Sequence, residues 1–476
     1  MFQVDCLFDF HGTDQTVTPS MNEYSISINE PDRFLTSYEV KQSTRNMTVC
    51  ELGLIEGELS LDRANKVINR LMRLYPFFSY GIRYDEEAQW MRYVQQPVRE
   101  VSLQISKTLH SLQDIGDFIA AASHSLNSQK LSDWEVVNIN IPEIATVKQA
   151  LCVKVYHTLM DAVSVMQLLK KFNEMYQDID CRFDDVEPVQ LSNYRPVMSY
   201  DPELGIQSHR QESYAHGPRV KVTQITGQYN DTLGSALKQM DECNLRCRFY
   251  RSEDIARIPN VQYSFSLYAI HFAQIAAYAY FNKDLPRDQK FVGCGVDLRR
   301  ENEMLKTDFD TILGQSATAS GVYIQASLQT TLQQLADQMQ RSHDSKDKSP
   351  EKFWEYALVN EMGPVQFDKG PSSCCLFVSN IGKMNLGSGP IVQMVGYASH
   401  THVWDQPMLG IANTVNNGKI GSFVVDWDVK MFTENQQEQN SQIYLELNKL
   451  IIARGAEIVC VQDVVDIYER LFTLGE

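Results

Sequence analysis

Two long stretches of this chain alternate between strand-type and helix-type hydrophobic patterns, and an aperiodic segment separates them. In the first stretch, the run from Thr146 to Tyr156 is almost continuously apolar, as expected of a strand buried on both faces. From His157 onward the apolar residues recur at helical spacing instead. The segment between about residues 178 and 226 loses this periodicity and contains four prolines. The pattern excludes an all-α or all-β chain and predicts an α/β protein of two halves.

The aperiodic segment sets the expected domain boundaries. We place the N-terminal half at residues 1–180, the crossover at 181–225 and the C-terminal half at 226–476. In the N-terminal half, the patterns predict strands over 49–59, 77–84, 90–94, 134–141 and 146–156, and helices over 61–74, 109–122 and 157–178, with Ser60 as an N-cap. In the C-terminal half, they predict strands over 290–296, 376–379, 392–397, 407–413 and 419–428, and helices over 233–240, 263–281, 330–342, 352–360, 436–453 and 461–472.

The charge balance excludes one class of partner. Asp and Glu number 60 against 43 Lys and Arg, which gives a net charge of −17. A surface that binds phosphate groups needs an excess of basic residues, so we expect no nucleic-acid partner. No stretch approaches the roughly 18–20 apolar residues that cross a bilayer. The first residues also lack the basic segment and apolar core of a signal peptide, so we expect a cytoplasmic protein without a membrane span.

The cysteines and histidines predict no metal site. Ten cysteines in 476 residues are too sparse for a disulfide scaffold, and we expect reduced thiols. Cys243 and Cys247 are spaced as CxxxC without a second pair at zinc-site spacing. His400 and His402 similarly lack a third and a fourth ligand at useful spacing.

One candidate for chemistry lies where the hydrophobic period changes. His157 follows the buried strand, and Asp161 comes four residues later, at the start of the helix. A neutral imidazole can accept a proton near neutral pH, so this pair is suited to general-base catalysis. A buried histidine with a single hydrogen-bond partner is the alternative interpretation, because an HxxxD spacing alone is common.

The same segment resembles a known motif. Tyr156–Ala162 resembles the HHxxxDG motif of the chloramphenicol-acetyltransferase-like acyltransferase superfamily, which includes nonribosomal-peptide condensation domains, plant BAHD acyltransferases, alcohol O-acetyltransferases and polyketide-associated acyltransferases. His157 and Asp161 match the second histidine and the aspartate of the motif. Tyr156 stands in place of the first histidine, and Ala162 stands in place of the glycine.

Further stretches resemble the same superfamily in the same order, and together they cover most of residues 33–450. They are Arg33–Glu39, the helix over 61–74 with the following Tyr75–Phe78, Asp297–Arg299 and Ser379–Gly382. The DFGWG motif of BAHD enzymes is absent, and Asp426-Trp427 lies in a different context. This departure favours the alcohol-acetyltransferase or condensation-like branches over the plant branch.

The resemblance implies a fold and a set of roles. The fold would consist of two chloramphenicol-acetyltransferase-like halves, each a mixed sheet with flanking helices, with an active-site tunnel between them. His157 would be the general base in this tunnel, and Asp161 would turn away from it to pair with Arg299. Ser379 and Asn380 would provide hydrogen-bond donors for the oxyanion. The resemblance implies no cofactor, since acyl-CoA would be a co-substrate, and it implies no metal.

The function expected from the resemblance is transfer of an acyl group, in the simplest case acetyl, from coenzyme A to a hydroxyl of a small-molecule acceptor. Arg299, Arg300 and Lys383 would contribute a local basic patch for coenzyme A. One alternative is condensation-like formation of an amide or ester from a thioester on a carrier protein acting in trans, with an alcohol or amine acceptor. The other is a non-catalytic binding protein that retains the fold. We expect a monomer, because two halves would supply both tunnel walls.

Overall fold

The computed structural model describes residues 48–85, 90–122, 125–126, 129–178, 245–252, 272–273, 275–276, 279–280, 289–297, 317–324, 326–344, 375–398, 408–416, 420–428 and 434–473. Several predictions lie outside these residues: the crossover over 181–225, the helices over 233–240 and 352–360, most of the helix over 263–281, and Arg299. The domain boundaries therefore stay predictions.

A five-stranded mixed sheet organises the N-terminal part of the chain. Its strand order is β11-β1-β6-β5-β4, and only β4 and β5 are parallel neighbours. The strands are β1 (Thr48–Glu56), β4 (Ile105–Leu109), β5 (Ser132–Ile139), β6 (Val147–Tyr156) and β11 (Ile391–Ala398). β1 and β6 are buried along almost their whole length because each has a strand on both sides and helices cover both faces of the sheet, which explains the continuous apolar run predicted for β6. β4 was not predicted.

Helices cover both faces of this sheet. Helices α2 (Leu61–Leu74) and α4 (Ala162–Asp178) pack on one face and share a hydrophobic core with it. Helix α3 (Leu112–Ala122) packs on the other face. The predicted bounds of α2 are confirmed, and so is its N-cap, since the Ser60 hydroxyl accepts a hydrogen bond from the Arg63 backbone N–H at 3.4 Å.

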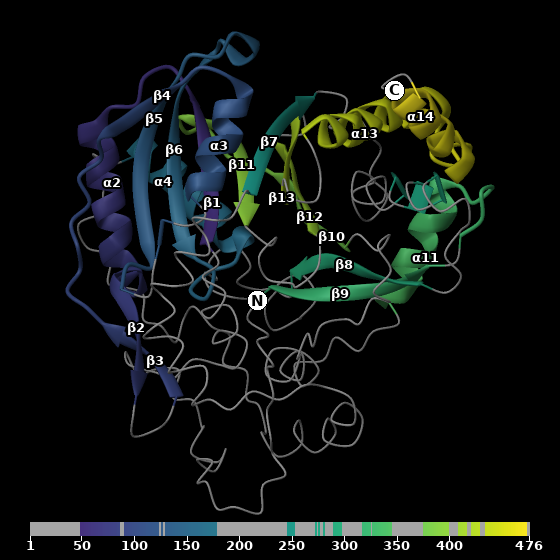
Figure 1. Cartoon of the computed structure of the whole chain (residues 1–476). Helices are drawn as coiled ribbons and strands as arrows, with labels where there is room; N and C mark the ends of the chain where they lie inside the picture. Colours follow the sequence, from purple (N-terminus) through teal and green to yellow (C-terminus); the bar gives the residue numbers. More distant parts are fainter. Residues whose placement is uncertain are drawn as a thin grey trace, which may run out of the picture.

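A two-stranded hairpin projects from the first sheet at the lower left of Figure 1. It consists of β2 (Tyr80–Asp85) and β3 (Trp90–Gln95), paired antiparallel from Tyr80↔Gln95 to Asp85↔Trp90. The hairpin was predicted, but its first strand begins at Tyr80 rather than Phe77. Pro76 instead starts a short 3₁₀ turn, η2 (Pro76–Ser79), which suits the fixed φ of proline.

A second, six-stranded mixed sheet has the order β7-β13-β12-β10-β8-β9. Its strands are β7 (Leu245–Ser252), β8 (Gln289–Asp297), β9 (Ala317–Ile324), β10 (Cys375–Met384), β12 (Met408–Asn416) and β13 (Ile420–Asp428). β7 and β9 were not predicted. The strand predicted over 376–379 is longer than expected, because β10 continues through Gly382 to Met384 in parallel pairing with β12, with a register irregularity between Asn380 and Gly382.

Three helices carry a separate hydrophobic core beside the second sheet, at the right of Figure 1. They are α11 (Leu332–Asp344), α13 (Glu434–Arg454) and α14 (Val461–Thr473), all three predicted within a few residues. A search of the described helices finds no span long and apolar enough to cross a membrane.

The two sheets are joined in two ways. Strand β11 follows β10 of the second sheet but pairs with β1 of the first, so a late segment of the chain completes the early sheet. Helix α3 packs between the sheets against β7, so closely that a Cβ at Gly116 would lie 2.0 Å from the Cys247 carbonyl oxygen. Residues of both sheets therefore share the hydrophobic cluster around α3.

Candidate active site

The His157 turn, residues 157–161, connects the last residue of β6 to the first residue of α4. The backbone N–H of Leu159 donates to the Tyr156 carbonyl at 2.8 Å, which closes the turn directly after the strand. The predicted change from strand to helix is thus confirmed in place, although the helix starts at Ala162 and His157 itself lies in the turn.

All of the His157 turn is buried. The His157 side chain is 7 % exposed, Thr158 and Met160 are fully buried, and Asp161 is 1 % exposed. The central position of β6 in its sheet carries the turn into the protein interior.

Asp161 caps the helix that follows the turn. Its Oδ1 accepts a hydrogen bond from the Ser164 backbone N–H at 2.8 Å, and its carbonyl accepts from the Val165 N–H at 3.1 Å. This is the geometry of an N-cap, and a carboxylate there also interacts favourably with the helix dipole. Asp161 thus fixes where α4 begins and, with it, where the His157 turn ends.

We expect Asp161→Ala to lower the free energy of unfolding by about 1–2 kcal/mol, because the cap hydrogen bond to Ser164 is lost. Asp161→Asn keeps a cap acceptor and should be the more stable of the two variants. Urea unfolding of both proteins measures the difference. If the two variants are equally unstable, the charge rather than the cap is what matters, as the predicted pairing with Arg299 requires.

Tyr93 of β3 contacts the same turn from the side of the hairpin. Its hydroxyl donates a buried hydrogen bond to the Thr158 carbonyl at 2.9 Å. Tyr93 was not among the predicted site residues.

Glu51 was also missed, and it is a carboxyl group in the interior of the first sheet. It lies in β1 opposite Val153 of β6 and Gly396 of β11. Its two carboxyl oxygens are buried and, among the described residues, have no hydrogen-bond partner. Gly396 provides the space, since a Cβ there would lie 2.2 Å from Glu51 Oε2. Burial, with a smaller effect from Cys50, raises the pKa of Glu51 well above its usual range.

The raised pKa predicts how pH affects stability. The folded protein keeps a proton on Glu51 that the unfolded chain releases above about pH 4.3. The free energy of unfolding therefore falls as the pH rises from about 4.3 to the pKa that Glu51 has in the folded protein. We expect Glu51→Gln to remove this dependence, which is worth up to about 1.4 kcal/mol per pH unit. Urea unfolding at about pH 5 and about pH 8 measures it. Glu56→Gln, at an exposed end of the same strand, is the matched control. Equal pH slopes in wild type and Glu51→Gln would contradict the prediction.

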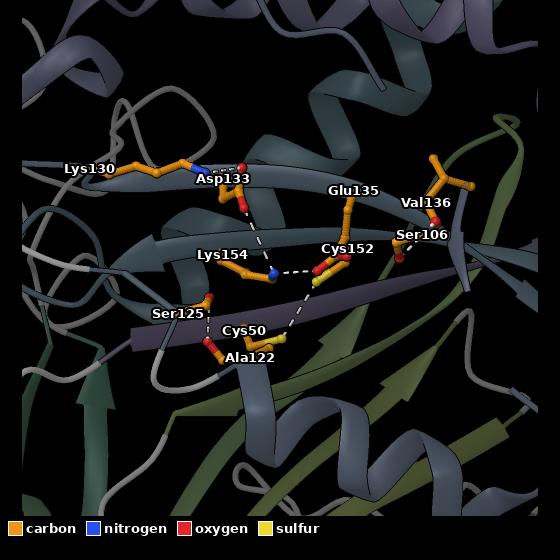
Figure 2. Close-up of polar contacts among 10 residues, drawn as sticks. All are labelled: Cys50, Ser106, Ala122, Ser125, Lys130, Asp133, Glu135, Val136, Cys152 and Lys154. Atoms are coloured by element: carbon orange, nitrogen blue, oxygen red, sulfur yellow. Dashed lines mark hydrogen bonds and ion pairs between the residues drawn. The ribbon is translucent and has the colours of Figure 1, made fainter. Parts of the chain in front are cut away.

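On the face of the first sheet opposite α2 and α4, Lys154 lies in a buried cluster of charges and thiols (Figure 2). Its Nζ forms an ion pair with Glu135 and lies 3.8 Å from Asp133 Oδ2. The sulfurs of Cys50 and Cys152 are 3.6 Å apart. Burial raises the pKa of the Cys152 thiol, which keeps it protonated and therefore a poor nucleophile.

The other predicted site residues belong to the second sheet. Ser379 and Asn380 lie in β10, where they pair with Ala412 and Asn413 of β12. Their side chains are outside the described part, so their role as oxyanion donors stays a prediction. The same holds for the pairing of Arg299 with Asp161. Among the described residues, no group of three or more His, Cys, Asp or Glu side chains has the geometry to hold a metal ion.

Comparison with known proteins identifies the fold. No protein-family model matches the sequence, and no curated protein is significantly similar to it. The three-dimensional structure is similar to that of polyketide synthase associated protein 5 from Mycobacterium tuberculosis, with a TM-score of 0.54 at 11 % identity over 88 % of this chain and 96 % of that one.

Two condensation domains show the same similarity. The condensation domain of the monacolin K polyketide synthase has a TM-score of 0.53 at 9 % identity, over 91 % of this chain and 99 % of that one. A mutant starter condensation domain of rhizomide synthetase, solved with C8-CoA and Leu-SNAC, has a TM-score of 0.52 at 12 % identity, over 90 % and 96 %. The chain therefore has the chloramphenicol-acetyltransferase-like fold of condensation domains, as the motif order predicted.

Proposed function

We propose, from the premise that the chain has the condensation-domain fold, that it is an acyltransferase. It moves an acyl group from a thioester to a hydroxyl or amine of a small-molecule acceptor and forms an ester or an amide. The observation that carries the proposal is the position of His157, in a buried strand-to-helix turn with an aspartate four residues later that caps the helix.

In the proposed mechanism, the His157 imidazole accepts the proton of the acceptor hydroxyl or amine as that group attacks the thioester carbonyl. The carbon–sulfur bond then breaks, the thiolate leaves, and the proton passes from the imidazole to the sulfur. A positioned base of this kind contributes about 10²–10⁴-fold, and alignment of the two substrates adds more. No acyl-enzyme forms, which agrees with the protonated, buried thiol of Cys152.

Coenzyme A is the donor that we propose first, with a hydroxyl as the acceptor. The rhizomide synthetase domain of similar structure was solved with C8-CoA, a coenzyme A thioester, and with Leu-SNAC. A carrier-bound thioester is the second candidate, since condensation domains are among the similar structures. In both cases Ser379 and Asn380 would stabilise the oxyanion, and Arg299, Arg300 and Lys383 would supply positive charge for an anionic donor.

Thiol release tests the proposal. The protein is incubated with acetyl-CoA, octanoyl-CoA or the matching N-acetylcysteamine thioesters, together with panels of alcohols and amines. We expect acceptor-dependent release of free thiol and an acylated product by mass spectrometry. Turnover with the N-acetylcysteamine thioesters but not with acetyl-CoA or octanoyl-CoA would favour the condensation-like reaction. Binding of acyl-CoA without turnover of any donor would overturn the proposal in favour of a non-catalytic binding protein.

A further inference from the structure

We infer that Tyr93 is a positioning residue, which holds the turn that carries the proposed general base through its hydrogen bond to the Thr158 carbonyl. The inference rests on the proposed function for its catalytic consequence, but the hydrogen bond and its effect on the His157 turn can be measured without turnover. Tyr93 Oη donates to the Thr158 oxygen at 2.9 Å, across 65 residues of sequence.

The Thr158 carbonyl needs such a partner. It belongs to the residue directly after His157, at a point where the β6 ladder has ended and α4 has not begun. Thr158 is fully buried, so little water is available to donate a hydrogen bond to its carbonyl oxygen. The Tyr93 hydroxyl donates to this backbone oxygen, and removing the hydroxyl would remove a buried hydrogen bond from the turn.

This carbonyl lies inside the turn that carries the imidazole. The turn is held at its start by the bond from Leu159 N–H to the Tyr156 carbonyl, and at its end by the Asp161 cap. Between these two points, the bond from Tyr93 restrains the Thr158–Leu159 peptide, one residue after His157. A shift of about 1 Å at a reacting group can cost about 100-fold in rate, so a restraint at this peptide matters for a base.

Tyr93 is itself rigidly held. Its side chain is 1 % exposed and belongs to the core shared by the first sheet, α2 and α4. Its backbone pairs with Ile82 across the hairpin, and its ring lies 6.3 Å from the Tyr80 ring at an interplanar angle of 50°. The ring packing fixes the direction of the hydroxyl at little entropic cost. The hairpin thus contacts the His157 turn through the Tyr93 hydroxyl.

Tyr93→Phe tests the inference, because it removes that hydroxyl and keeps the ring. We expect kcat of acyl transfer to fall about 10-fold with KM within about twofold of wild type, since the base is misplaced while binding surfaces persist. The ¹⁵N-histidine NMR signals of His157, assigned by comparison with His157→Gln, should shift. Amide hydrogen exchange at Leu159 and Met160 should accelerate.

Tyr80→Phe is the matched control, because it removes a hydroxyl from the neighbouring buried tyrosine of the same hairpin. It should leave the His157 signals and the exchange rates of the turn as in wild type. Unchanged His157 signals and unchanged exchange in Tyr93→Phe would overturn the inference. Shifted signals in a protein whose wild type transfers no acyl group would overturn the proposed function and leave the positioning role of Tyr93 standing.

Discussion

Replacing His157 with glutamine is expected to reduce acyl transfer by about 10²–10⁴-fold, because the amide cannot accept the proton of the attacking acceptor. The buried turn is the reason for using glutamine, which fills a similar volume and stays polar. At 7 % exposure, His157 has almost no solvent to substitute for its hydrogen bonds, so an apolar replacement would mix loss of catalysis with loss of stability. KM should change little, since the imidazole acts in the transition state.

Steady-state thiol release, with urea unfolding of the same samples, measures this effect. His110→Gln is the control, since His110 is an exposed histidine just before α3, and we expect it to match wild type in both measurements. A His157→Gln enzyme that keeps wild-type kcat would remove the general base from the mechanism. Retained folding with lost turnover is the result that separates a catalytic histidine from a structural one.

Asn173→Ala is expected to cause the largest loss of stability, about 3–5 kcal/mol. Asn173 of α4 is fully buried, and its amide group makes three hydrogen bonds to the segment that enters β11. Nδ2 donates to the carbonyls of Leu386 and Ile391, each at 2.9 Å, and Oδ1 accepts from the Ile391 N–H at 2.8 Å. Alanine would remove all three buried hydrogen bonds, at about 1–3 kcal/mol each before relaxation.

The consequence reaches the proposed active site through the sheet. Asn173 fixes the start of β11, and β11 pairs with β1 from Val49↔Ala398 to Ile55↔Ile391. β1 in turn pairs with β6, which ends in the His157 turn. If β11 loosens, the edge of β1 that pairs with it becomes exposed, and β1 is the strand that pairs with β6. We therefore expect the variant to have lower acyl-transfer activity even at temperatures where it is still folded.

Gln177→Ala is the matched control for Asn173, one turn further along α4. Its Nε2 donates to the Ser388 carbonyl in the same segment, but both groups are exposed, so water replaces the bond. We expect a loss of less than about 1 kcal/mol for this variant. Urea unfolding followed by circular dichroism compares the two. Equal losses in both variants would mean that Asn173 contributes through helix α4 alone and not through β11.

Local patterns predicted the parts of the fold whose partners are near in sequence. The helix Leu61–Leu74 was predicted to its end residues because Ser60 and Pro76 mark its limits. The insertion of β11 into the first sheet was not predictable in this way, since its neighbour β1 lies more than 300 residues earlier in the chain. The edge strands β4, β7 and β9 were missed because they have fewer neighbours and a weaker apolar pattern.

The same distinction, between contacts near in sequence and contacts between distant segments, applies to the residues of the proposed site. His157 and Asp161 could be found because the strand, the turn and the helix cap are consecutive, and their spacing is a local property of the backbone. Tyr93 and Glu51 were not found. Tyr93 reaches the turn from another sheet, and Glu51 has its space only because Gly396 of β11 lies opposite. Contacts of this kind depend on packing between distant segments, which no sequence window contains.

For this protein, consecutive residues were enough to establish an acidic α/β chain with an HxxxD pair at a strand-to-helix turn, because hydrophobic period and capping act over a few residues. Only the tertiary structure established that β11 pairs with β1 at the edge of the first sheet, that Asn173 holds β11 there, and that Tyr93 is hydrogen-bonded to the His157 turn. The reason is physical: a buried polar group must find a partner in three dimensions, and in each case the chain supplied one from a remote segment.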